Sequence, residues 1–254
     1  MIVSMIDLGV STSIAKKYQY SWKYTIDYCL ENNLEAIQFY LSQIEIPKIS
    51  AGCTIVKKYL HLPVLLQGNL NPILNACNEY RTYYKSNKLI IHQKESISIN
   101  SQIKTILLFT NQGYKIGLEN DGGDNLKSYF KLIESYYRLD DNVFAVLDVH
   151  RFFHNHYHIY PKEIILDEVI RTLKWCKQMN INIVLHAIDS TSFGGDREFW
   201  CPIFKGLIPY RDIFFYLVNK EIYIESVIFE FETEDNTSMS ITALKKVVKI
   251  FGKN

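Results

Sequence analysis

Short, strongly apolar runs alternate with longer amphipathic stretches from one end of the chain to the other. Each run is rich in Val, Ile, Leu and Phe and is largely without polar residues at alternate positions, which is typical of parallel strands covered on both faces. We expect eight such strands, at residues 2–8, 35–40, 61–67, 88–93, 115–120, 143–149, 182–188 and 226–232.

The stretches between these runs carry helical signals. In residues 163–178 apolar side chains recur at three- and four-residue intervals. Residues 124–138 open with Asp124 as a candidate N-cap, and further helices are expected at 100–112 and 238–251.

The alternation predicts the fold class. Eight strand–helix pairs give about 32 residues per repeat, close to one βαβ step, and no linker rich in Pro, Gly or Ser divides the chain. The sequence therefore predicts a single (β/α)₈ TIM barrel over residues 1–254. An open doubly wound sheet is the alternative, but no G-x-G-x-x-G motif follows the first strand.

Composition narrows the class of protein. The chain is 48% hydrophobic with a formal net charge of +1 at pH 7, so it lacks the basic surplus typical of nucleic-acid binding. Five scattered cysteines without a CxxC pair indicate reduced thiols. No run approaches the ~18 apolar residues of a membrane span. We expect a soluble cytoplasmic protein. The charge does not favour nucleic acid as a partner, although a local basic patch would still allow it.

Polar side chains stand at the carboxyl ends of the predicted strands. In a barrel these ends meet around one mouth, where active sites lie. Any one of these residues alone has a structural explanation, as an ion-paired glutamate or a core histidine. The residues are Gln67, His92, Glu119, Asp148, His186 and Glu230, with Glu232 on the same strand face as Glu230.

Taken together, these side chains predict a metal centre. A ring of carboxylates and imidazoles repels itself without a cation, and a divalent metal resolves that repulsion. We expect one ligand each from Glu119, Asp148, His186 and Glu230. Such a donor set favours Mn²⁺, Mg²⁺, Co²⁺ or Fe²⁺, whereas further ions held by His92 and other His and Asp residues would favour Zn²⁺.

The same segments resemble the xylose isomerase-like barrels, which include sugar epimerases, inosose-type enzymes and the endonuclease IV family. "GLEN" (117–120) is similar to the group's fifth strand, "VLDVH" (146–150) to the sixth and "VLHAIDS" (184–190) to the seventh. "KGLIPYRDIFFYL" (205–217) resembles the segment that opens the last helix, and "YIESVIFE" (223–230) resembles the closing strand. The likeness covers most of the chain.

Resemblance to the epimerases implies a metal on the four predicted ligands, with Glu119 and Glu230 as proton-transfer groups across the substrate. The metal would polarise a carbonyl and acidify the neighbouring C–H. The histidine-rich segment 150–158 would be a lid, or else an ordinary solvated loop. The expected substrate-binding residues are Gln67, His92, His150, His154, Asp196 and Arg197.

Resemblance to the endonuclease IV family rests on "HAIDSTSFGGDRE" (186–198) and its Asp-Arg dipeptide. In that family a zinc-binding His follows the dipeptide, and here Glu198 stands there. The family's third strand also ends in a zinc-binding His, where we expect Gln67. A further His lies three residues after the sixth-strand Asp, whereas His150 and His154 lie two and six residues after it. These departures count against a trinuclear zinc cluster.

The leading hypothesis is therefore a divalent metal-dependent isomerase or epimerase acting on a small carbohydrate-like carbonyl compound. Metal-dependent phosphodiester hydrolysis at abasic DNA is the second hypothesis, and a barrel without turnover is the third. Because barrels of this group often associate, a homo-oligomer is also open.

Overall fold

The computed structural model describes residues 6–42, 45–63, 66, 68–92, 99–120, 125–194 and 196–251. Its barrel strands are β1 (Asp7–Ser11), β2 (Ala36–Tyr40), β3 (Lys57–His61), β4 (Lys88–His92), β5 (Lys115–Glu119), β6 (Val143–Asp148), β7 (Ile183–Ala187) and β10 (Ser226–Phe229). The α-helices are α1 (Trp22–Glu31), α2 (Asn71–Tyr84), α3 (Ile99–Thr110), α4 (Ser128–Tyr137), α5 (Val149–His156), α6 (Lys162–Gln178), α7 (Tyr210–Asn219) and α8 (Glu234–Phe251). Shorter elements are η2 (Thr12–Tyr18), η3 (Ser50–Thr54), η4 (Arg197–Phe199), β8 (Asp189–Ser190) and β9 (Trp200–Cys201).

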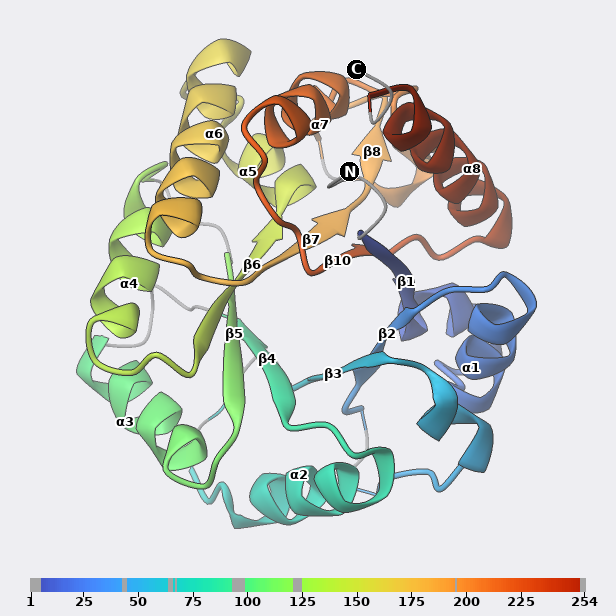
Figure 1. Ribbon diagram of the computed structural model, residues 1–254, viewed down its shortest axis with the longest axis vertical. Coiled ribbons are helices and arrows are strands. Elements are labelled where there is room, and N and C mark those ends of the chain that lie inside the picture. Colours follow the sequence, from blue (N-terminus) through green and yellow to red (C-terminus); the bar gives the residue numbers. More distant parts are fainter. Residues whose placement is uncertain are drawn as a thin grey trace.

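The strands close into a ring that the helices surround (Figure 1). Around the ring the order is β1, β10, β7, β6, β5, β4, β3 and β2, and β1 pairs in parallel with both β2 and β10. This closed parallel barrel confirms the predicted (β/α)₈ fold. In the part of the chain that the structure describes, no helix combines the length and apolar character that crossing a membrane requires.

The barrel interior changes from apolar to polar toward the carboxyl ends of the strands. Successive side chains point to opposite faces, so every second strand residue faces the barrel axis. Gly117 makes room there, because a Cβ at this position would lie 2.5 Å from the Phe144 ring. Nearer the carboxyl ends the inward residues are polar, for example Gln38 after Ala36. The apolar interior layer consists of Ala36, Tyr59, Ile90, Phe144, Val146, Val184 and Ile228.

Strand three differs from the prediction. It spans Lys57–His61 and not 61–67, and it pairs with β2 from Ala36 opposite Lys57 to Tyr40 opposite His61. Because two lysines begin it, this strand does not form a continuous apolar run in the sequence. Both are accommodated, since Lys57 lies 3.6 Å from a buried glutamate and Lys58 donates to a backbone carbonyl. The strand that we expected to end at Gln67 therefore ends at His61.

Other boundaries also moved. β1 lies later than the predicted 2–8, and α8 begins four residues before the predicted 238. Asp124, the expected cap of α4, lies outside the described residues. The segment 150–158 is mostly helix α5 and not a solvated loop, because Asp148 caps its first turn and Phe152 and Phe153 are buried in the core.

Candidate active site

Glu119 occupies the middle of a polar cluster at the carboxyl ends of the strands. It is the last residue of β5 and is 1% exposed. His61 Nε2 lies 2.8 Å from its Oε2, and His186 Nδ1 lies 3.3 Å from its Oε1. Burial disfavours the charged carboxylate, but the neighbouring His92, His186 and Arg151 outweigh it and hold the pKa of Glu119 well below its usual value. Glu119 is therefore ionised.

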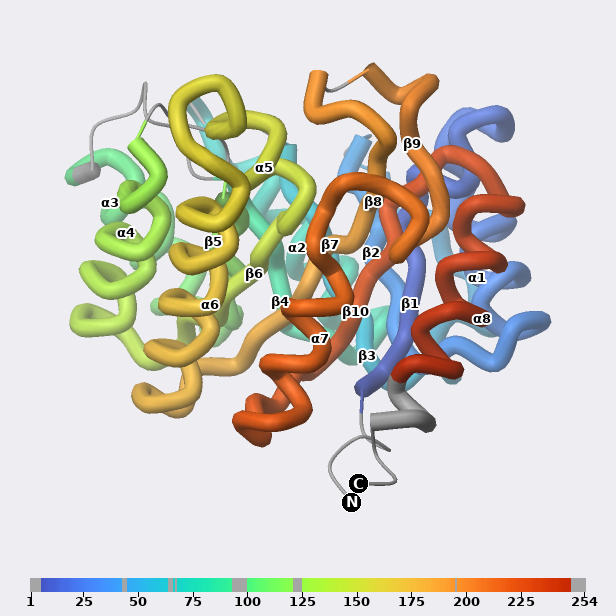
Figure 2. Tube along the Cα trace, turned by 90° about the horizontal axis from the view of Figure 1, so that it is seen from above, coloured from blue at the N-terminus to red at the C-terminus, as the bar shows by residue number. Residues whose placement is uncertain are grey.

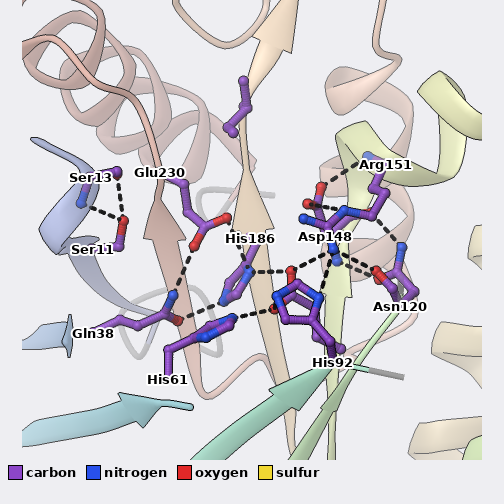
Figure 3. Close-up of polar contacts among 12 residues, drawn as sticks. Ser11, Ser13, Gln38, His61, His92, Asn120, Asp148, Arg151, His186 and Glu230 are labelled. Atoms are coloured by element: carbon purple, nitrogen blue, oxygen red, sulfur yellow. Dashed lines mark hydrogen bonds and ion pairs between the residues drawn. The ribbon is translucent and has the colours of Figure 1, made fainter. Parts of the chain in front are cut away.

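The hydrogen bonds of His186 define its tautomer (Figure 3). Gln38 Nε2 donates to Glu230 Oε1 at 2.8 Å, so the Gln38 carbonyl oxygen is the atom that faces His186 Nε2, at 2.7 Å. Nε2 therefore carries a proton, and the lone pair of neutral His186 is on Nδ1. That atom lies 3.3 Å from an oxygen of Glu119 and 3.3 Å from an oxygen of Glu230. It is buried and, among the residues that the structure describes, has no hydrogen-bond partner.

A lone pair that faces two carboxylates requires a cation between them. A proton can serve: burial opposes the imidazolium, but Glu230 and Glu119 outweigh it and raise the pKa of His186 well above its usual value. A metal also fits, because ligands about 2.0–2.2 Å from one ion lie roughly 3.0–3.5 Å from each other. A ligating His commonly donates its second ring N–H to a neighbouring acceptor, as His186 does to Gln38.

Glu230 is held from the side of β2. Its Oε1 accepts the Gln38 amide and also the Tyr40 hydroxyl, at 2.9 Å. Burial again opposes its charge, but His186 outweighs the burial and lowers the pKa of Glu230. Both glutamates beside His186 are therefore carboxylates at neutral pH.

A second donor group lies on the other side of Glu119. His61 Nδ1 donates to the backbone carbonyl of Leu62 at 2.9 Å, so Nε2, which lies 2.8 Å from Glu119 Oε2, is the nitrogen that a metal could take in place of a proton. His92 Nε2 lies 3.7 Å from the same carboxylate oxygen. Two sets of three potential ligand atoms thus share Glu119, and within each set the three atoms lie within 4.8 Å of one another. They are His61, His92 and Glu119, and Glu119, His186 and Glu230.

Asp148 lies at the same mouth but in neither donor group. Its Oδ1 accepts the backbone N–H of Arg151 at 2.9 Å, and its Oδ2 lies 3.3 Å from Arg151 Nε. The Asn120 side chain bonds the backbone of Asp148 through both its oxygen and its nitrogen. Burial raises the pKa of Asp148 to about 6, with Arg151 opposing the rise and the nearby glutamates adding to it. Asp148 as a fourth metal ligand stays a prediction.

A cavity of about 290 Å³ opens at this mouth, lined in part by Tyr40, Asp148, Arg151 and Glu230. Figure 2 shows that α5 and the β8–β9 ribbon lie at the same end of the barrel. Of the predicted substrate-binding residues, His150, His154 and Arg197 line the cavity and His92 lies in the second donor group. Asp196 is exposed and is not part of the lining. Gln67 lies outside the described residues.

Arg197 does not reach the donor groups. Its guanidinium pairs with Glu232 and lies 5.5 Å from the centroid of the Trp200 ring. Glu232 also accepts Lys16 Nζ at 2.6 Å, so it ties the loop after β8 to η2, whereas Glu230 faces His186. The loop is anchored further by Asp189, whose carboxylate accepts backbone N–H groups downstream. The Asp of "HAIDS" therefore has a structural role.

Four residues at the mouth were missed from the sequence. Gln38 could have been found, because it lies two residues after Ala36 on the inward face of a correctly predicted strand, and Tyr40 follows two residues later. His61 was hidden by the misplaced third strand. Arg151 could only have been suspected from its position three residues after Asp148, one helical turn away.

No protein-family description and no curated protein matches this sequence, but solved structures share the complete fold. The chain is similar to the probable 3-DHS dehydratase AsbF of Bacillus anthracis, with a TM-score of 0.66 and 15% identity over 97% of this chain and 99% of that one. It is similar to the IolI protein with a bound zinc atom, with a TM-score of 0.65 and 15% identity over 97% and 96% of the two chains. A xylose isomerase domain-containing protein of Salmonella typhimurium has a TM-score of 0.61 and 8% identity over 98% and 96%. The fold is thus a TIM barrel of the xylose isomerase-like type, as the motifs predicted.

Proposed function

We propose that this protein is a metal-dependent enzyme that transfers a proton beside the carbonyl group of a small polyhydroxylated compound, as in isomerisation or epimerisation. The observation that carries the proposal is the position of His186 Nδ1 between two ionised carboxylates, where a divalent ion can take the place of the proton. Glu119, His186 and Glu230 would hold the metal, and Asp148 would be a fourth ligand, since a carboxylate oxygen can accept a second partner while Arg151 stays paired with it. The bound ion would polarise the substrate carbonyl and acidify the adjacent C–H. The zinc in IolI supports a divalent cation, and the carboxylate-rich set also suits Mn²⁺, Mg²⁺, Co²⁺ or Fe²⁺.

Glu119 and Glu230 are the candidate proton-transfer groups. Each has a lowered pKa and so can accept a proton at neutral pH. Glu230 also lines the cavity, where a substrate would meet it. Gln38 and Tyr40 donate hydrogen bonds to Glu230 and thereby orient its carboxylate.

The cavity suits a small substrate with hydroxyl groups. Its volume of about 290 Å³ is at the lower end of ligand-pocket sizes. Burial, assisted by His154 and Arg151, lowers the pKa of His150 to about 4, so its ring is neutral and can both donate and accept hydrogen bonds. We expect His150 and His154 to bind substrate hydroxyls opposite the half-buried Trp200.

Phosphodiester hydrolysis is the second candidate, and one observation favours it. The His61–His92–Glu119 group provides a second potential cation position beside the first, and paired metals are typical of phosphodiester cleavage. Against it stand the near-neutral charge of the chain and Glu198 in place of a histidine.

The two functions separate in one set of assays. Protein loaded with Mn²⁺ or Zn²⁺ would be incubated with a panel of ketoses in D₂O, and deuterium beside the carbonyl would be measured by mass spectrometry. A duplex with one abasic site would be tested for nicking in parallel. We expect deuterium uptake that Glu119→Gln abolishes and that Glu163→Gln, on the exposed face of α6, retains. Nicking without deuterium uptake would reject the isomerase, and neither activity in metal-loaded protein would reject both.

A further inference from the structure

The contact with Arg151 determines which ring nitrogen of His92 carries the proton. Its Nη1 lies 2.9 Å from His92 Nδ1. A guanidinium has only donors, so Nδ1 must be the acceptor and must carry no proton. Neutral His92 therefore has its proton on Nε2, the atom that points toward Glu119 Oε2 at 3.7 Å.

This tautomer sets His92 apart from the other two histidines at the mouth. His61 and His186 each donate one ring N–H to an oxygen acceptor away from Glu119, so the nitrogen that faces Glu119 can exchange its proton for a metal. His92 turns an N–H toward the same residue. A metal ligand must offer a lone pair, so His92 cannot complete the group that it forms with His61 and Glu119 while Arg151 holds it.

The guanidinium is anchored where it also repels a second cation. Its Nε lies 3.3 Å from Asp148 Oδ2, its Nη1 donates to the Asn120 carbonyl at 3.3 Å, and Nη1 lies 3.5 Å from Glu119 Oε1. In Figure 3 the Arg151 side chain lies against Asp148 and Asn120. A positive charge fixed beside the shared glutamate disfavours a second ion next to it.

We infer that Arg151 restricts the barrel mouth to one divalent metal, held through Glu119, His186 and Glu230, by keeping His92 in the tautomer that cannot bind. The inference rests on the metal site of the proposed function and deepens it. A mouth with one ion suits polarisation of a carbonyl, whereas two adjacent ions suit phosphodiester cleavage. Arg151 is thus a positioning residue that selects between the two chemistries this set of donors could perform.

The number of bound ions tests the inference directly. Metal-free protein would be titrated with Zn²⁺ in a calorimeter, and the content after dialysis measured by elemental analysis. We expect one ion per chain for the wild type and two for both Arg151→Ala and Arg151→Met, the latter keeping an unbranched apolar side chain in place of the arginine. Adding His92→Gln to Arg151→Ala should return the number to one. Arg171→Ala is the control: it removes an arginine that pairs with Glu168, three residues before it on α6, and should still bind one ion.

The outcomes distinguish this inference from the proposed function. If no form binds zinc, the metal-dependent function fails and the inference with it. If the wild type binds two ions, or a folded Arg151 variant binds only one, the inference alone is overturned. A measurement on the unmodified protein completes the test: ¹⁵N NMR of the metal-free chain should show His92 protonated on Nε2 and not on Nδ1, and the opposite tautomer would reject the inference even if the variants do not fold.

Discussion

Gln38 is fully buried and bonds two members of the donor group, His186 and Glu230, so replacing it should disturb both stability and metal binding. Gln38→Leu removes the hydrogen bond to the Glu230 carboxylate, worth about 1.5–3 kcal/mol, and the bond with His186, worth about 0.5–1.5 kcal/mol. We expect the free energy of unfolding to fall by about 2–4 kcal/mol. Tyr40 still donates to Glu230 in the variant, so the carboxylate keeps one of its two partners.

The larger effect should be on metal affinity. Without the Gln38 oxygen, nothing in the described surroundings fixes the His186 proton on Nε2, and the lone pair on Nδ1 is no longer guaranteed. Loss of a group that orients a ligand typically costs 10–100-fold in affinity. That range corresponds to about 1.4–2.7 kcal/mol. A competition titration with a chromophoric zinc chelator would measure the dissociation constant, and circular dichroism would verify the fold.

Gln178→Leu is the matched control, because Gln178 is exposed at the end of α6 and far along the chain from the mouth. It should leave both stability and affinity unchanged. A folded Gln38→Leu protein that binds zinc within twofold of the wild type would refute the assignment of the His186 tautomer and of its role.

Three further predictions follow from the contacts. Glu230→Gln should abolish zinc binding, whereas Glu232→Gln, which only releases Lys16 and Arg197, should weaken it less than threefold; calorimetry compares the two, and the reverse order would transfer the ligand role to Glu232. Glu225→Gln should cost about 3 kcal/mol at pH 7 because it leaves Lys88 without its buried partner. Burial opposes the charge of Glu225, but Lys88 outweighs it and lowers the pKa of Glu225, so the stability contributed by the pair is present above pH 4.5 and is lost as the pH falls. Urea unfolding should therefore show the difference in unfolding free energy between variant and wild type shrinking in acid. A difference that stays constant with pH would contradict the pairing. Gly206→Ala should lower the melting temperature, since a Cβ there overlaps the Asp189 carboxylate that anchors the loop, and an unchanged melting curve would show that the loop can shift without cost.

Much of this protein could be predicted from its sequence because strand and helix patterns are local. Unalternated apolar runs and three- to four-residue periodicity need only neighbouring residues to be recognised, and their order specifies the barrel. The inward face of each strand follows from a period of two, which is why Glu119, His186 and Glu230 could be placed together at one mouth. The third strand was misplaced because two lysines begin it and it therefore lacks a continuous apolar run, so His61 at its end was not recognised as a residue of the mouth.

What the tertiary structure alone decided is the protonation pattern and pairing of the site. The bond that orients His186 comes from Gln38, 148 residues earlier, and Glu230 lies 192 residues from the amide that holds it. Which nitrogen of each histidine carries a lone pair depends on partners from other strands and from α5, and no local pattern encodes them. Glu230 and Glu232 look equivalent along the strand, yet one faces His186 and the other binds Lys16 and Arg197. The residue types at the mouth are thus determined along the chain, whereas their chemistry is determined by which distant groups donate to them.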